Sequence, residues 1–137
     1  MASQMQLVIY EGYLGGDAEV SFTQSAKTVS NFRFASSRTY TAGDGKKVEE
    51  TTWIRVTAWG KLAEVVGNYC KKGTHVIVQG SLKPGENGNP TVYQRKDGSY
   101  GASYEMTAEK VRILNPKSTS GESEIVAEAD TDIEPGW

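Results

Sequence analysis

The sequence contains few of the residues with which proteins bind metal ions or form disulfides. There is one cysteine, Cys70, and one histidine, His75, among 137 residues. A single cysteine excludes an intrachain disulfide, and one cysteine with one histidine is too few soft ligands for a zinc site. We therefore expect no metal, no cofactor, and a fold that is held together by packing.

Long hydrophobic runs are also absent. No stretch approaches the roughly 20 apolar residues that a membrane-spanning helix needs. Residues 1–6 lack the basic segment and apolar run of a secretory signal and the arginines of an organelle presequence. If the chain is complete, these features predict a cytoplasmic protein, and its length predicts one domain with its own core.

Charge is distributed unevenly along the chain. Six acids and one base give residues 116–137 a net charge of −5, and because the whole chain carries −2, residues 1–115 carry +3. A basic body with an acidic end indicates a nucleic-acid binder with an interaction tail, although a solvated surface with a plain disordered end fits as well. Apolar residues are sparse and without period from Pro116 onward. We therefore expect a domain of residues 1–115 and a disordered acidic tail of residues 116–137.

Alternating apolar residues predict five strands, over residues 6–13, 29–40, 48–59, 76–80 and 104–114. Between the third and fourth strands, apolar residues at helical spacing predict a short helix that contains Leu62, Val65, Val66 and Tyr69. Glycine-rich residues 83–101 predict a protruding hairpin or mobile loop. This order of elements indicates an all-β protein, a five-stranded OB-fold Greek-key barrel.

The third predicted strand separates its side chains into two sets. A period of two places one set where it can fill a barrel: Ile54, Val56 and Ala58. The outward set is Trp53, Arg55, Thr57 and Trp59. Exposed indole rings need a cover, and a stack of bases supplies one, since base–aromatic stacking contributes about 1–3 kcal/mol per base whatever the sequence. Packing of both tryptophans against residues 83–101 or a subunit partner is the alternative.

Basic residues interleave with aromatic ones, which predicts phosphate contacts beside stacking rings. The candidates are Arg33, Arg38, Arg55, Lys61, Lys72, Arg95 and Lys96. Such binding should weaken as salt rises, because neutralised phosphates release counterions. We expect the remaining aromatic residues of the early strands and the helix to lie in the core: Tyr10, Tyr13, Phe22, Phe32, Phe34 and Tyr69.

No group of residues suited to catalysis is apparent in the sequence. Glu49 and Glu50 are adjacent and point to opposite faces of a strand, so they do not form a cooperating pair of acids. His75 has no neighbouring cysteine, serine or paired carboxylate, and we expect it to be an exposed strand residue. The sequence therefore predicts a binding protein and not an enzyme.

Two segments, WIRVTAWGKLAEVVGNYCKKGTHVIVQGSL (residues 53–82) and NFRFASSRTY (residues 31–40), resemble the bacterial-type single-stranded DNA-binding proteins. The resemblance covers roughly residues 9–114. It implies that Tyr40, Trp53, Trp59 and Tyr93 stack on DNA bases. It also implies that the basic side chains of Arg33, Arg55, Lys61 and Lys72 contact DNA. It also implies a nucleoid-associated homotetramer that binds single-stranded DNA without sequence preference and protects it in replication, repair and recombination. Many relatives have histidine near a subunit contact where this chain has Ile54.

The end of the chain resembles the docking peptide of the same family, which has clustered aspartates, an aliphatic residue, proline and a terminal phenylalanine. Here residues 130–137 read DTDIEPGW, with one residue inserted on each side of the proline. The resemblance implies that genome-maintenance proteins are recruited through Asp130, Asp132, Ile133, Pro135 and Trp137; a plain solubilising end is the alternative. Two other classes of function stay open: an OB-fold adaptor for proteins or structured RNA, and an enzyme without a recognisable motif.

Overall fold

The computed structural model describes residues 4–115 and 125–129, and its centre is a closed five-stranded barrel. The barrel strands are β1 (Val8–Leu14), β3 (Thr28–Thr41), β4 (Lys47–Trp59), β5 (His75–Leu82) and β7 (Tyr100–Ile113). They are hydrogen-bonded in the order β1-β5-β7-β4-β3, and β3 closes the circle by pairing with β1. Only β4 and β7 pair in parallel. The predicted all-β OB-fold is confirmed.

A short helix, α1 (Gly60–Tyr69), connects β4 to β5, as predicted. Gly60 adopts a φ of 65°, a left-handed conformation that glycine tolerates and that turns the chain sharply out of β4. The helix buries Leu62, Ala63 and Val66 and packs against β3, β4 and β7. Together with the inward side chains of the strands, these residues form one core.

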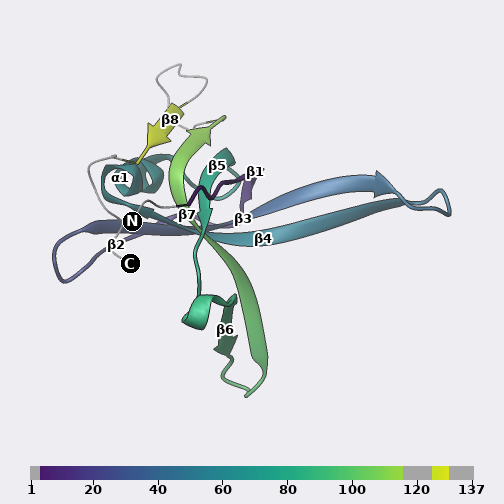
Figure 1. Cartoon of the computed structure of the whole chain (residues 1–137). Coiled ribbons are helices and arrows are strands. Elements are labelled where there is room, and N and C mark those ends of the chain that lie inside the picture. Colours follow the sequence, from purple (N-terminus) through teal and green to yellow (C-terminus); the bar gives the residue numbers. More distant parts are fainter. Residues whose placement is uncertain (1–3, 116–124, 130–137) are drawn as a thin grey trace.

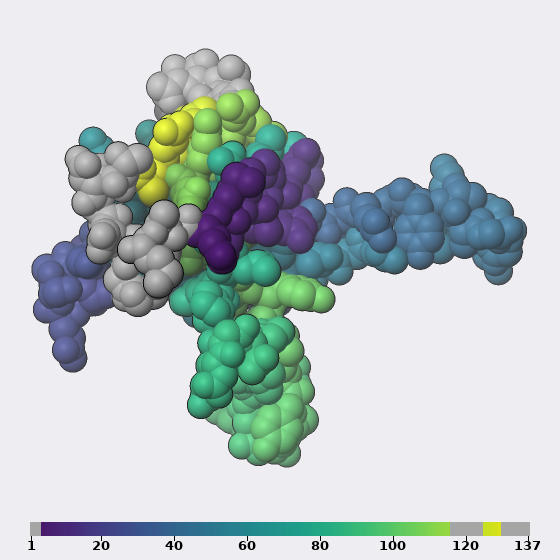
Figure 2. Space-filling model, viewed as in Figure 1, coloured from purple at the N-terminus to yellow at the C-terminus, as the bar shows by residue number. Residues whose placement is uncertain are grey.

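Two arms extend from the barrel (Figures 1 and 2). The first is the outer part of the β3–β4 hairpin, which reverses direction near Gly45, where φ is 85°. The second follows a single turn of 3-10 helix, η1 (Glu86–Gly88), and consists of β6 (Thr91–Gln94) paired with the first part of β7. Residues 83–101 were predicted to be a hairpin or loop, and this β6–β7 hairpin is what they form.

Two short strands were not predicted. β2 (Glu19–Phe22) adds to β3, and β8 (Ile125–Glu128) adds to the end of β7. Ala127 of β8 is buried, and Lys110 Nζ lies 3.2 Å from Glu128 Oε1. The expectation that no regular structure follows residue 116 is therefore wrong for residues 125–128. Hydrogen bonds to β7 stabilise this strand, although its local sequence has no strand pattern. The other parts of the predicted tail, residues 116–124 and 130–137, lie outside the described residues.

The prediction that the early aromatic residues fill the core is correct for two of them. Phe32 and Phe34 are buried, whereas Tyr10, Tyr13 and Phe22 are exposed. Tyr13 stacks on His75 with ring centroids 4.4 Å apart, and His75 Nε2 lies 2.7 Å from Glu11 Oε2. His75 is consequently half-buried instead of exposed. Tyr69, as expected, packs against the core.

Cys70 is buried at the end of α1, and burial raises the pKa of its thiol from 9.0 to about 12. Over residues 4–115 and 125–129, no group of three or more His, Cys, Asp or Glu side chains could hold a metal ion. In the same residues, no helix is long and apolar enough to cross a membrane.

Candidate nucleic-acid interface

The candidate site lies on the outer face of the β3–β4 ribbon. Pairing of β3 with β4 places Arg33 opposite Arg55 and Ala35 opposite Trp53. Side chains alternate along each strand, so the neighbouring residues of the same two strands point inward: Phe32, Phe34, Ile54 and Val56, all buried. The sequence predicted an inward and an outward set of side chains on β4. The inward positions of Ile54, Val56 and Ala58 are confirmed, and so is the exposure of Trp53 and Arg55.

Two members of the predicted outward set differ from the expectation. Thr57 is buried, and its hydroxyl donates a hydrogen bond of 2.9 Å to Asn31 Oδ1. Trp59 is half-buried at the start of α1. Thr57 is thus tied to the neighbouring strand β3, and Trp59 is the residue from which the chain enters the helix.

The Trp53 indole is held by two neighbours from other strands. Gly15, just beyond β1, lies so close that a Cβ on it would come within 2.7 Å of Trp53 Cζ3. The ring therefore packs on bare glycine backbone. The guanidinium carbon of Arg33 lies 5.1 Å from the ring centroid, within the range of a cation–π interaction. Trp53 stays 45% exposed, and so it remains accessible to a ligand.

Tyr93 repeats this arrangement on the β6–β7 arm. A Cβ on Gly101 would lie 2.7 Å from Tyr93 Cζ, and the guanidinium carbon of Arg95 lies 5.4 Å from the Tyr93 ring centroid. Arg95 Nη1 donates a 2.7 Å hydrogen bond to the carbonyl oxygen of Tyr100, which fixes the guanidinium near the ring. Two predicted stacking rings thus share one local construction of glycine, aromatic ring and arginine.

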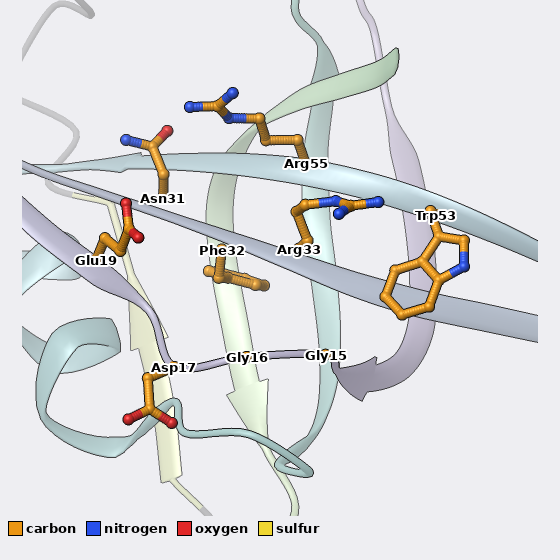
Figure 3. Close-up of a pocket in the computed structure, with 9 residues that line it drawn as sticks. All are labelled: Gly15, Gly16, Asp17, Glu19, Asn31, Phe32, Arg33, Trp53 and Arg55. Atoms are coloured by element: carbon orange, nitrogen blue, oxygen red, sulfur yellow. The ribbon is translucent and has the colours of Figure 1, made fainter. Parts of the chain in front are cut away.

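Two grooves meet at Trp53, Arg33 and Arg55. The first runs toward β2 and is lined by Gly15, Gly16, Asp17, Glu19, Asn31, Phe32, Arg33, Trp53 and Arg55 (Figure 3). The second runs toward the β6–β7 arm and is lined by Arg33, Glu50, Thr51, Thr52, Trp53, Arg55, Thr91, Tyr93, Ala102, Ser103, Tyr104 and Glu105. The three shared residues make one continuous surface from β2 to the second arm.

The charge at the junction of the two grooves is positive, while four acids also line the grooves: Asp17, Glu19, Glu50 and Glu105. Arg33 and Arg55 lie directly opposite each other, and like charges in that position are destabilising unless something compensates them. Glu105 is the partner of Arg55 on β7, yet no ion pair within 4.0 Å forms between them. Among the described residues, neither arginine has a carboxylate in ion-pair contact. A bound phosphodiester, which carries one negative charge, would offset part of this repulsion.

The remaining predicted site residues lie away from this centre. Arg38 and Tyr40 are on the outer part of the first arm, and by alternation they belong to the opposite face from Trp53. Arg38 Nε donates to Glu50 Oε2 at 3.0 Å, and its guanidinium carbon lies 5.7 Å from the Tyr40 ring centroid.

The predicted lysines are dispersed. Lys61 is exposed on α1, and Lys96 is exposed beyond β6, in the turn of the second arm. Lys72 is at the border of the first groove, where its backbone N–H donates to Asp17 Oδ1 at 2.8 Å. The five predicted partner-docking residues lie outside the described residues: Asp130, Asp132, Ile133, Pro135 and Trp137.

Sequence reasoning missed several groove residues. Asn31 alternates with Arg33 on β3, so the period of two that separated the faces of β4 could have identified it. Tyr104, which is 64% exposed, lines the second groove. Glu19 belongs to the unpredicted strand β2, and no local pattern indicated its position.

Comparisons with known proteins agree with this architecture. Residues 5–114 match the Single-strand binding protein family. Over 111 residues the chain is 35% identical to the single-stranded DNA-binding protein of Neisseria meningitidis serogroup B. The aligned region covers 81% of this chain and 60% of that protein. Over 121 residues it is 32% identical to single-stranded DNA-binding protein 1 of Chlorobaculum tepidum, which covers 88% of this chain and 72% of that protein.

A solved structure has a similar fold. The small single-stranded DNA-binding protein from Streptomyces coelicolor superposes with a TM-score of 0.63 at 20% sequence identity, over 77% of this chain and 90% of that chain.

Proposed function

Because the chain belongs to the single-strand binding protein family, we propose that its outer β3–β4 face binds single-stranded DNA without strong sequence preference. Proteins of this family bind DNA without catalysing a reaction, so membership bears out the prediction that the chain is not an enzyme. The observation that carries the proposal is the Trp53 ring, which lies exposed beside the unneutralised pair Arg33 and Arg55.

Binding combines stacking with phosphate contacts. A base stacks on Trp53, and a second base stacks on Tyr93 across the second groove. Arg33 lies over the indole in the free protein, so in the complex it moves off the ring and, with Arg55, holds a phosphate. Other aromatic and basic residues extend the path of the DNA strand around the barrel and along the arms: Trp59, Tyr40, Arg38, Arg95, Lys61, Lys72 and Lys96.

Family membership also supports a proposal about the wider role of the protein. We propose that the protein is cytoplasmic and nucleoid-associated, and that it protects exposed strands during replication, repair and recombination. Four copies would assemble as a homotetramer. Exposed apolar side chains around the β1 side of the barrel are suited to burial between subunits: Leu7, Ile9, Tyr10 and Leu82. The terminal residues 130–137 would dock genome-maintenance proteins.

The experiment that tests DNA binding is a fluorescence anisotropy titration of a labelled single strand and of its matching duplex at low and high salt. We expect tight binding of the single strand, weak binding of the duplex, and affinity that falls as salt rises. The double variant Arg33→Gln with Arg55→Gln should lose most of this affinity. Lys83→Gln is the control, because it removes a positive charge from a side chain that lines neither groove. Equal affinity for duplex and single strand would favour an adaptor instead.

A further inference from the structure

Arg95 is held in place by the protein itself, at the turn of the second arm. Its backbone N–H donates a 2.7 Å hydrogen bond to the carbonyl oxygen of Ser99, and its Nη1 donates one of 2.7 Å to the carbonyl oxygen of Tyr100. The backbone of Arg95 thus closes the turn between β6 and β7, and its side chain reaches back across that turn. The guanidinium therefore has a fixed position before any ligand binds.

The fixed guanidinium and the Tyr93 ring both lie over Gly101. A Cβ added to this glycine would come within 2.6 Å of Arg95 Nη2 and within 2.7 Å of Tyr93 Cζ. Gly101 is not among the glycines with a left-handed φ, so the position needs glycine for space and not for its backbone conformation. Bare backbone on one strand and the arginine on the other together determine where the Tyr93 ring lies.

Arg95 and Arg33 differ in their relation to the two grooves. Arg33 lines both grooves, and within residues 4–115 and 125–129 no hydrogen bond or ion pair holds its side chain. Arg95 lines neither groove, although Tyr93 lines the second and is 45% exposed. Arg33 is therefore free to leave its ring for a phosphate, whereas Arg95 stays beside its ring, outside the groove that the ring lines.

We propose that Arg95 is a positioning residue, which holds the Tyr93 ring in the orientation in which a base stacks on it and does not itself hold a phosphate. This inference rests on the proposed function and replaces the phosphate contact that the sequence predicted for Arg95. The cation–π interaction and the hydrogen bond to Tyr100 order the ring in the free protein. A ring that is already ordered loses less conformational entropy when a base stacks on it, so binding is tighter.

A double-mutant cycle in the full chain tests this role. Fluorescence anisotropy measures the affinity for labelled oligo-dT in the unaltered protein, in Arg95→Gln, in Tyr93→Ala and in the double variant. Arg95→Gln should weaken binding about two- to fivefold when Tyr93 is present. It should have no effect when Tyr93→Ala is already present, because Arg95 acts through the ring. An equal loss in both backgrounds would mean that Arg95 contacts DNA by itself, and the inference would be wrong.

Lys96→Gln is the matched control for charge, since it removes one positive charge from the next residue of the same arm. Lys96 is exposed and has no hydrogen bond or ion pair within the part of the chain that the structure describes. Any effect of Lys96→Gln on affinity should therefore be the same with and without Tyr93→Ala. If this effect also vanished in Tyr93→Ala, loss of the ring would release the whole arm from DNA, and the coupling would not identify Arg95 as the residue that positions the ring.

Ser99→Ala is the control for the structure of the turn. It removes a hydroxyl that donates to Asp97 Oδ1 at 2.6 Å and lies 3.5 Å from Arg95 Nη1. The hydrogen bond from Arg95 to Tyr100 is kept, because its acceptor is a backbone oxygen. Affinity should equal that of the unaltered protein. A loss as large as that in Arg95→Gln would assign the effect to the turn and not to the ring.

Salt dependence separates positioning from a phosphate contact. The slope of log affinity against log salt should be the same in Arg95→Gln as in the unaltered protein, because no phosphate contact is lost. A slope reduced by about 0.7 would assign a phosphate to Arg95 and overturn the inference. Unchanged affinity in Tyr93→Ala would remove the stacking role of Tyr93, and this inference with it, while DNA binding at Trp53 stands. Failure of the unaltered protein to bind oligo-dT would overturn the proposed function itself.

Discussion

The two faces of the β3–β4 ribbon are built from alternate residues of the same strands and have opposite roles. The inner face carries Phe32, Phe34, Ile54 and Val56, which lose nearly all contact with water. The outer face carries two opposed arginines and a half-exposed tryptophan. The side chains of the inner face are buried within the barrel, whereas the outer face leaves charged and aromatic side chains exposed. Stability and binding should therefore respond to different substitutions along one ribbon.

The largest expected effect is on the inner face. Phe34→Ala removes a fully buried ring and should lower the free energy of unfolding by about 3–5 kcal/mol. Denaturant unfolding measures this free energy. Arg33→Ala is the control, because Arg33 is the neighbouring residue on the outer face and its loss should change stability little. If both substitutions cost the same stability, the distinction between the faces is wrong.

The next effect is on binding. Trp53→Ala should weaken single-stranded DNA binding by about 1–3 kcal/mol, roughly 5- to 150-fold, because one base loses its stack. Anisotropy measures the affinity, and an unfolding experiment confirms that the variant is folded under the conditions of the binding assay. Phe22→Ala is the matched control, since Phe22 is an exposed aromatic residue that lines neither groove. Unchanged affinity in Trp53→Ala would contradict the stacking role.

A smaller effect concerns pH and belongs to the core. Burial raises the pKa of the Cys70 thiol from 9.0 to about 12, so between these values the unfolded chain releases a proton that the folded chain keeps. The stabilising effect is complete below pH 9 and is lost as pH rises toward 12, by about 1 kcal/mol at pH 10. Unfolding free energies at pH 8 and pH 10 test this, against Cys70→Ala, in which the thiol's share of the decline should vanish. An identical decline in both proteins would refute it.

The smallest effect is on salt dependence. Arg33→Gln removes one phosphate contact and should reduce the slope of log affinity against log salt by about 0.7. Between 50 and 200 mM salt this amounts to about a 2- to 3-fold difference in the loss of affinity. Lys83→Gln, a charge outside the two grooves that meet at Trp53, should leave the slope unaltered. A slope unchanged by Arg33→Gln would mean that Arg33 holds no phosphate.

The sequence was sufficient for the barrel because its strands and helix are strongly periodic. Alternation along residues 48–59 separated Ile54 and Val56 from Trp53 and Arg55, and the structure agrees. The same alternation was wrong for Thr57, which is buried and donates to Asn31 of the neighbouring strand, a pairing that the local sequence does not show. The four-residue strand β2 was missed because it is too short to give a pattern. β8 was missed for a related reason, because its stability comes from pairing with β7.

The site was predictable only in part. Arg33, Trp53 and Arg55 follow from strand alternation, and the structure brings them together. The contribution of Tyr93 depends on how the β6–β7 arm folds back, and that is set by pairing across residues 91–103 and not by local sequence. Glu19 and Asn31 become neighbours only through pairing of β2 with β3.

The central claim is that a base stacks on Trp53, and single-tryptophan proteins test it most directly. The chain has three tryptophans, so Trp59→Phe with Trp137→Phe leaves only Trp53, and Trp53→Phe with Trp137→Phe leaves only Trp59. In the first protein, single-stranded DNA at low salt should strongly quench the fluorescence, whereas the matching duplex should not. Unchanged Trp53 fluorescence under conditions where anisotropy shows the strand bound would contradict the account.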